Sequence, residues 1–219
     1  MSSMQQIDKY ATLVGRSLRM LFKRERDRRR HAHSPYAWLF QPYMGEELVA
    51  LACQVTPGPE PVLSIAAVVL NQQRVQLSQA WQATLADGEA TCDKTVRRHQ
   101  ELYDTQTTLC FSAHTLRGLA EFIGNRPLIG WQLEQQLIML DSAFRAHLGF
   151  GLPNAQVDVA RLHHRQLRRR HPLVETSCQF SEALTCWQVP SVAARGLLGK
   201  ATASALLYMR LQRDMAQSG

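Results

Sequence analysis

The chain has 219 residues, of which 45% are hydrophobic and 20% are charged, and its formal net charge is +7. This length and composition are typical of one folded globular domain with a short extension, and they exclude an intrinsically disordered chain. No apolar run approaches the roughly 20 residues that span a bilayer, and the polar start of the chain shows no signal-peptide pattern. The five cysteines are scattered and odd in number, which favours free thiols in a reducing cytoplasm over a disulfide framework.

The positive charge is concentrated in two segments, residues 23–30 and residues 161–170. The first ends a basic amphipathic helix that is predicted over residues 7–30. The aromatic segment 34–43 follows and is expected to cover the domain irregularly. Together the two basic segments predict a surface that tracks a phosphate backbone. A solvated helix face is the alternative for each, and a membrane-surface contact is a further alternative for the first. Residues 1–45 are therefore interpreted as a basic helix with an aromatic linker.

Apolar residues predict two strands at 47–54 and 62–70, which a proline-rich turn joins. A third strand is predicted over residues 74–82, because apolar and polar residues alternate there. Three strands at such short spacing favour an antiparallel meander. Residues 84–95 are polar and are expected to form a loop.

Helices alternate with short strands in the rest of the chain. Apolar spacing and turn residues predict these elements in order: a helix at 113–123, a strand at 127–131, a helix at 132–147, a strand and helix start at 155–162, and helices at 174–189 and 192–215. The order β-β-β-α-β-α-β-α-α predicts an α/β fold with a mixed central sheet flanked by helices.

Three stretches resemble the motifs of one family. Ser64-Ile65-Ala66-Ala67-Val68 resembles the second strand of the hairpin that opens the DnaQ-like (DEDD) 3′–5′ exonucleases, the family of the polymerase III epsilon proofreading subunit, RNase T and oligoribonuclease. Residues 130–140 and 195–205 resemble its second and third motifs. The resemblance implies a ribonuclease H-like domain over residues 46–212, with a tail at 213–219.

The family hydrolyses the terminal phosphodiester with two Mg²⁺ or Mn²⁺ ions, which four carboxylates hold beside a histidine or tyrosine base. Aligned by resemblance, the four carboxylate positions fall on Ala52, Gln54, Gln136 and Lys200, and the base falls on Arg195. Hard divalent cations bind through anionic oxygen, which none of these side chains supplies. The resemblance therefore implies an inactive exonuclease fold without a metal cofactor.

Two binding hypotheses follow from these replacements. In the first, the protein is a pseudoenzyme that binds single-stranded nucleic acid or nucleotide phosphate, because the former metal pocket becomes neutral to positive. Its candidate contacts are Arg161, Arg165, Arg168, Arg169, Arg170 and Lys200. In the second, the protein is an interaction or regulatory subunit that dimerises or docks on a protein partner. Trp81, Trp131 and Trp187 would anchor that partner if they are exposed.

The third hypothesis is a residual 3′–5′ exonuclease with a displaced metal site. Glu134, Asp141 and Asp158 remain near the lost motifs, and the first two are seven residues apart on one predicted helix face. A solvated face is the alternative for these acids. His163 and His164 are also expected on a solvated helix face, because no acidic or cysteine neighbour completes a metal site.

Overall fold

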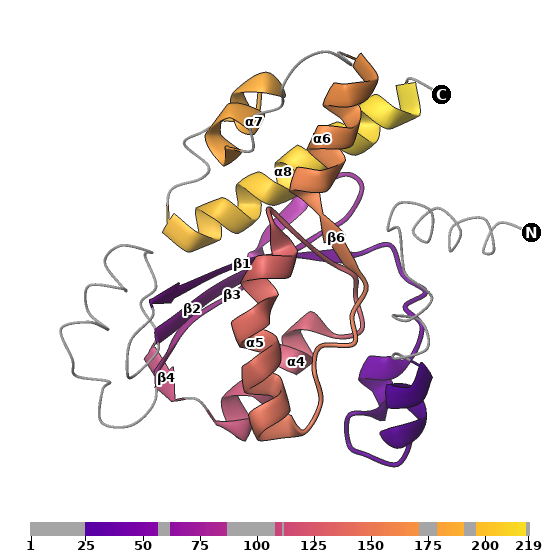
Figure 1. The fold of residues 1–219 in the computed structure, drawn as a ribbon, viewed down its shortest axis with the longest axis vertical. Coiled ribbons are helices and arrows are strands. Elements are labelled where there is room, and N and C mark those ends of the chain that lie inside the picture. The colour runs from indigo at the N-terminus through magenta and orange to yellow at the C-terminus, as the bar shows by residue number, and fades with distance from the viewer. Residues whose placement is uncertain are drawn as a thin grey trace, which may run out of the picture.

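The computed structural model describes residues 25–56, 62–86, 108–110, 112–170, 179–190 and 196–217. These residues form an α/β fold in which helices flank a six-stranded mixed sheet (Figure 1). The strands are β1 (Leu48–Thr56), β2 (Val62–Leu70), β3 (Val75–Ala86), β4 (Thr108–Cys110), β5 (Leu128–Gly130) and β6 (Gln156–Asp158). The helices are the 3₁₀ helix η1 (Ala37–Phe40), α4 (Ala113–Ile123), α5 (Leu133–Leu148), α6 (Val159–Arg170), α7 (Phe180–Cys186) and α8 (Gly196–Gln217). None of the described helices combines the length and apolar character needed to cross a membrane.

The strand order across the sheet is β4-β3-β2-β1-β5-β6. Strand β2 pairs antiparallel with both β1 and β3, whereas β4, β5 and β6 join by parallel pairing. Strand β2 therefore runs opposite to all the other strands. All nine residues of β2 are buried, because helices cover both faces of the sheet.

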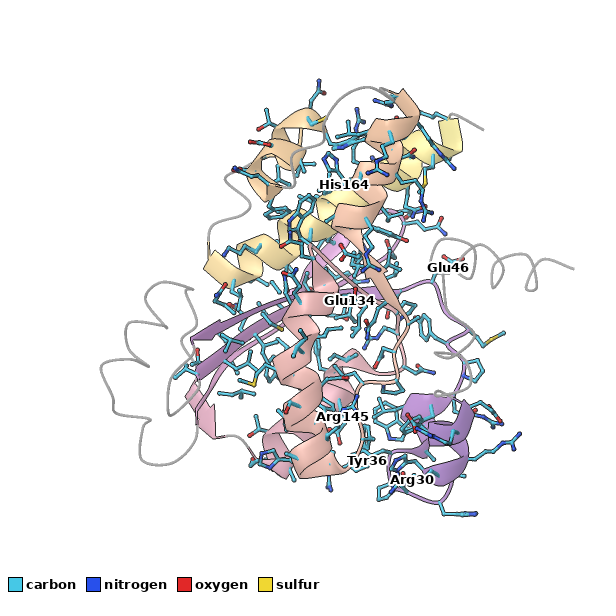
Figure 2. The ribbon with its side chains drawn as sticks, viewed as in Figure 1. Arg30, Tyr36, Glu46, Glu134, Arg145 and His164 are labelled. Carbon is cyan, nitrogen blue, oxygen red and sulfur yellow. The ribbon has the colours of Figure 1, made fainter. Side chains whose placement is uncertain are left out.

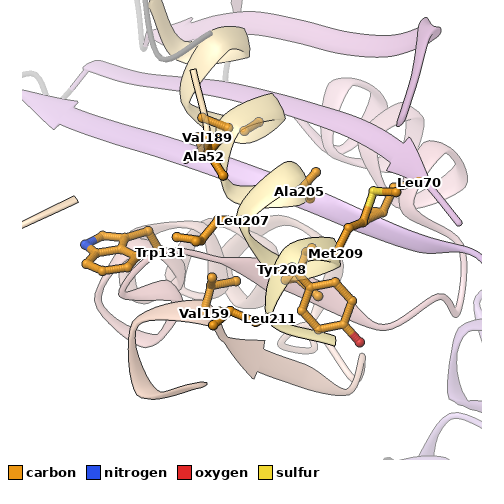
Figure 3. Packing of buried hydrophobic residues seen from close by; sticks show 14 of the residues in the cluster. Ala52, Leu70, Trp131, Val159, Val189, Ala205, Leu207, Tyr208, Met209 and Leu211 are labelled. Carbon is orange, nitrogen blue, oxygen red and sulfur yellow. The ribbon is translucent and has the colours of Figure 1, made fainter. Parts of the chain in front are cut away.

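Side chains of β1 alternate between the two faces of the sheet. Ala50 and Ala52 belong to the buried cluster beneath α8, whereas Val49 and Leu51 belong to the cluster formed with α4 and α5. Helix α8 adds alanines of its own to the first cluster, including Ala205 (Figure 3). Small residues on both partners let a helix lie close to a sheet, so α8 packs directly over β1 and β2.

The second cluster also receives the aromatic segment that precedes β1. Phe40 of η1 is buried and contacts Phe150 with ring centroids 5.4 Å apart, and His31 stacks on Phe40 at 5.2 Å. Tyr36 lies against the same Phe150 ring at 5.1 Å. Residues 25–45 therefore pack on the sheet domain through their aromatic side chains.

Strand β3 differs from its prediction in two ways. It continues to Ala86 instead of ending near residue 82, because Thr84 and Ser64 are both buried and share a hydrogen bond of 2.8 Å. Its register against β2 also shifts between Val68 and Val69, which leaves Leu77 exposed rather than on the buried face. A bulge of this kind adds residues to one strand without changing its apolar pattern.

Three other predictions about elements needed correction. Strand β4 lies in a stretch for which no element was predicted. Within the helix predicted at 174–189, α7 covers only Phe180–Cys186, and residues 174–178 lie outside the described residues. Gln188 ends α7 in a left-handed conformation with φ 56°, and Val189 N–H then bonds the Leu184 carbonyl. Helix α8 continues to Gln217, so the start of the expected tail at 213–219 is helical.

A buried histidine joins α6 to the turn after α7. The indole N–H of Trp187 donates to Nδ1 of His163 at 2.8 Å, and both side chains are buried. Burial, with a smaller contribution from His164, lowers the pKa of His163 to about 4. The predicted solvated face is therefore wrong for His163, which is neutral in the folded protein at pH 7.

Acidification should therefore weaken the fold through His163. The unfolded chain binds the histidine proton near pH 6.5 and the folded chain only near pH 4, so stability falls as the pH falls between these values. Through this group, the free energy of unfolding at pH 4.5 is lower than at pH 7 by on the order of 2 kcal/mol. Urea unfolding at pH 7 and pH 4.5 should show a smaller acid-induced loss for His163→Leu than for the wild type. Equal losses in both proteins would refute this assignment.

Candidate functional site

The positions that the resemblance singles out lie on three elements of the fold. Ala52 and Gln54 lie in the second half of β1, Gln136 lies in the first turn of α5, and Lys200 lies near the start of α8. Ala52 shares a buried cluster with Ala201, which follows Lys200. Arg195 lies outside the described residues. Ala52, Gln54 and Gln136 therefore lie around β1, and Lys200 lies on the helix that packs over this strand.

Gln136 connects α5 to this end of the sheet. Its Oε1 accepts the backbone N–H of Cys53 at 2.9 Å, and its Nε2 donates to the Trp131 carbonyl at 2.6 Å. Strand β5 ends at Gly130, so it does not reach the Cys53 amide, and the glutamine takes the place of a strand neighbour. Gly130 permits this arrangement, because a Cβ there would lie 2.7 Å from the Leu51 carbonyl oxygen. The Gln136 amide is therefore part of the framework.

The other three positions differ in exposure. Ala52 is only 3% exposed and lies beneath α8. Gln54 is half-buried, and its amide makes one long contact of 3.4 Å to the Val55 carbonyl. Lys200 is also half-buried, and its backbone carbonyl accepts the Ser204 hydroxyl at 2.8 Å. The site thus consists of a methyl group, two amides and an ammonium group.

The remaining acids near the motifs serve local structure instead of converging. Glu134 pairs with Arg161, while Asp141 pairs with Arg145 at 3.0 Å, and Figure 2 shows Glu134 and Arg145 far apart along α5. Asp158 accepts backbone N–H groups at the start of α6, the nearest at 2.9 Å. In the described part of the chain, no three His, Cys, Asp or Glu side chains gather where they could hold a metal ion.

Helix α6 presents an exposed row of arginines, named here the α6 arginine face, which consists of Arg161, Arg165, Arg168 and Arg169. Offsets of four, seven and eight residues place these side chains on one side of a helix. Arg161 pairs with Glu134. The other three make no ion pair with a carboxylate among the described residues. This face is therefore positive and open to solvent.

Three predicted contributors lie elsewhere. Arg170 pairs with Asp214 of α8, and its guanidinium lies 4.9 Å from the centre of a Trp187 ring, so it faces α8. Lys200 precedes Asp214 by fourteen residues, which is roughly 21 Å along a helix. The described part of the first basic segment surrounds Arg30, which Figure 2 places far from His164 of α6. Four of the six predicted contacts therefore form the α6 arginine face, and Arg170, Lys200 and the first basic segment are not part of it.

Two of the three tryptophans expected as anchors lie in the interior. Trp131 and Trp187 are 7% and 5% exposed, and Trp131 packs on Phe180 with ring centroids 5.1 Å apart. Trp81 is half-buried on β3. Trp131 and Trp187 therefore serve the core and cannot anchor a partner.

Sequence reasoning missed a hollow of about 360 Å³, named here the α8 pocket. It lies between the β2–β3 turn, the end of α7 and the second half of α8. Its lining residues are Gln73, Arg74, Val75, Trp187, Gln188, Val189, Pro190, Leu206, Met209, Arg210 and Arg213. The spacing of Arg210 and Arg213 puts both on one helix face. The sequence gives no sign that Arg74, which precedes β3, lies beside them.

Comparisons with known proteins do not assign the chain to a family. No model of a known protein family matches it, and no curated protein sequence is significantly similar to it. Its function is therefore inferred from its residues and their geometry.

Removing the Gln136 bridge should destabilise the fold. Gln136→Ala leaves the Cys53 N–H and the Trp131 carbonyl without their side-chain partner, which costs about 1–3 kcal/mol. Thermal unfolding should show a melting temperature lower by several degrees. Gln135→Ala is the matched control, because Gln135 is exposed on the same turn of α5. Equal melting temperatures of the two variants would show that the Gln136 hydrogen bonds do not stabilise the fold.

Proposed function

We propose that the chain is a ribonuclease H-like domain of the DnaQ exonuclease type that has lost catalysis and binds single-stranded nucleic acid without metal ions. The strand order β3-β2-β1-β5-β6, with β2 antiparallel to the rest, supports this class. So does the contact of Gln136 with β1 beside Ala52 and Gln54, where the family motifs would converge.

Loss of catalysis is supported by the chemistry of these side chains. Two divalent ions need several anionic oxygen ligands, and the four positions provide none. Burial of Ala52 beneath α8 leaves no room at its position for an ion with its water shell. An ammonium group at Lys200 adds repulsion for any cation nearby.

The α6 arginine face carries the binding proposal. Arg165, Arg168 and Arg169 are exposed, and no carboxylate of the described residues neutralises them. Guanidinium groups bind phosphate oxygens through paired hydrogen bonds and remain charged at every physiological pH. Helical spacing keeps the three side chains on one side, so successive phosphates of a strand are their natural ligands.

A protein-interaction or regulatory role is the alternative, and it has less support. Of the three tryptophans expected as anchors, Trp131 and Trp187 are buried. The exposed large apolar side chains Trp38, Met44, Leu77 and Ile138 are spread over η1, the segment before β1, β3 and α5. A partner recovered from lysate after nuclease treatment would favour this alternative.

Binding should depend on the α6 arginine face and on salt. Fluorescence anisotropy with labelled 12-mers of single-stranded DNA and RNA in EDTA should show affinity that falls steeply between 50 and 200 mM salt. The triple variant Arg165→Gln, Arg168→Gln, Arg169→Gln should bind at least about 10-fold more weakly. Its slope of log affinity against log salt should be smaller by about 2, because each lost phosphate contact contributes about 0.7.

A charge-matched variant controls for net charge. Arg30→Gln, Arg117→Gln and Arg145→Gln together remove the same charge from exposed positions away from α6 and should leave the affinity nearly unchanged. Equal weakening in both triple variants, or binding that requires Mg²⁺, would contradict the proposal.

Nuclease activity should be absent. A 5′-labelled single strand incubated with the protein and Mg²⁺ or Mn²⁺ should keep its full length on a denaturing gel. The displaced-site hypothesis predicts instead a ladder of 3′-shortened products that disappears in Glu134→Ala and persists in Glu182→Ala, an exposed acid on α7. Such a ladder would refute the loss of catalysis.

A further inference from the structure

The α8 pocket lies at the other end of α8 from the replaced family positions. Lys200 is ten residues before Arg210, so roughly 15 Å of helix separates the two sites. The β2–β3 turn supplies one wall, and the end of α7 supplies another. The pocket is therefore a separate site with its own chemistry.

The rim of the pocket is positively charged. Arg74 comes from the β2–β3 turn, and Arg210 and Arg213 come from α8. All three are exposed, and none forms an ion pair with a carboxylate of the described residues. Asp214, the acid next to Arg213, is paired with Arg170 instead. Three guanidinium groups around one hollow favour an anion with several oxygens, of which a phosphate monoester is the best match.

The floor of the pocket is apolar. Val75, Leu206 and Met209 contribute aliphatic side chains, and Pro190 adds a rigid ring. Methionine adapts its shape to planar groups better than branched residues do. A ligand for this site therefore carries an apolar, flat part in addition to its anion.

Gln188 adds a hydrogen-bonding group at a conformational cost. It occupies the left-handed position after α7 that glycine normally fills, with φ 56°. A side chain there is disfavoured, and this one lies at the pocket together with Gln73. Two amides can donate to and accept from the edge of a heterocyclic ring.

We propose that the α8 pocket binds a nucleoside monophosphate, with the phosphate at Arg74, Arg210 and Arg213 and the base over the apolar floor. A hollow of about 360 Å³ is at the small end of ligand pockets and accommodates one nucleotide. A free nucleotide and the phosphorylated end of a strand offer the same chemistry. The proposal does not depend on the α6 arginine face.

Calorimetric titration of the full chain with AMP, in EDTA and 50 mM salt, tests the site. AMP should bind, whereas adenosine and ribose 5-phosphate, which each lack one half of the recognised groups, should bind at least 10-fold more weakly. Arg210→Gln and Arg213→Gln should each weaken AMP binding roughly 10-fold or more. Arg30→Gln, an exposed arginine outside the pocket, should bind AMP like the wild type.

Two further measurements make the outcome decisive. Gln188→Gly should weaken AMP binding while raising the melting temperature, because glycine relieves the left-handed backbone. A 5′-phosphorylated tetranucleotide that binds more tightly than AMP supports the strand end as the source, and weaker binding supports the free nucleotide. The proposal is overturned if AMP does not bind, if adenosine or ribose 5-phosphate binds as tightly, or if the Arg210 and Arg213 variants bind AMP normally. None of these results alters the anisotropy test of the α6 arginine face.

Discussion

Close packing of α8 on β1 and β2 is the contact on which the rest of the structure depends. Alanines on the sheet face an alanine-bearing side of the helix, so the two approach without long side chains between them. This approach buries Ala52 of β1. It also fixes the second half of α8 against the β2–β3 turn, where the α8 pocket forms. The packing of α8 on the sheet thus determines both the burial of Ala52 and the position of the α8 pocket.

At the carboxyl end of β1, the side chain of Gln136 has a structural role. A carboxylate at residue 136 could accept the Cys53 N–H but would repel the Trp131 carbonyl, whereas the amide of Gln136 satisfies both. The amide of Gln136 is therefore a structural group that joins α5 to β1. Acids that remain nearby are occupied in the same way, as Asp158 is at the start of α6.

Some arginines of the protein are neutralised by ion pairs, and others are exposed without an ion pair among the described residues. Arg161 and Arg170 at the two ends of α6 pair with Glu134 and Asp214. The arginines between them, and those around the α8 pocket, do not pair with acids of the described residues. Exposed ion pairs contribute little to stability, so the paired arginines serve mainly to orient α6. The unpaired ones provide the charge that an anionic ligand would recognise.

The sequence by itself determined the α/β class, the hairpin of β1 and β2 and the helix α4. These features depend on local apolar periodicity and residue identity, which are read directly from the chain. Only the tertiary structure decided the bulge in β3, the burial of His163 and the direction of Arg170, because each depends on neighbours distant in sequence. The α8 pocket belongs to the same group: its arginines come from positions 74, 210 and 213, and only the packing of α8 on the sheet brings them to one hollow.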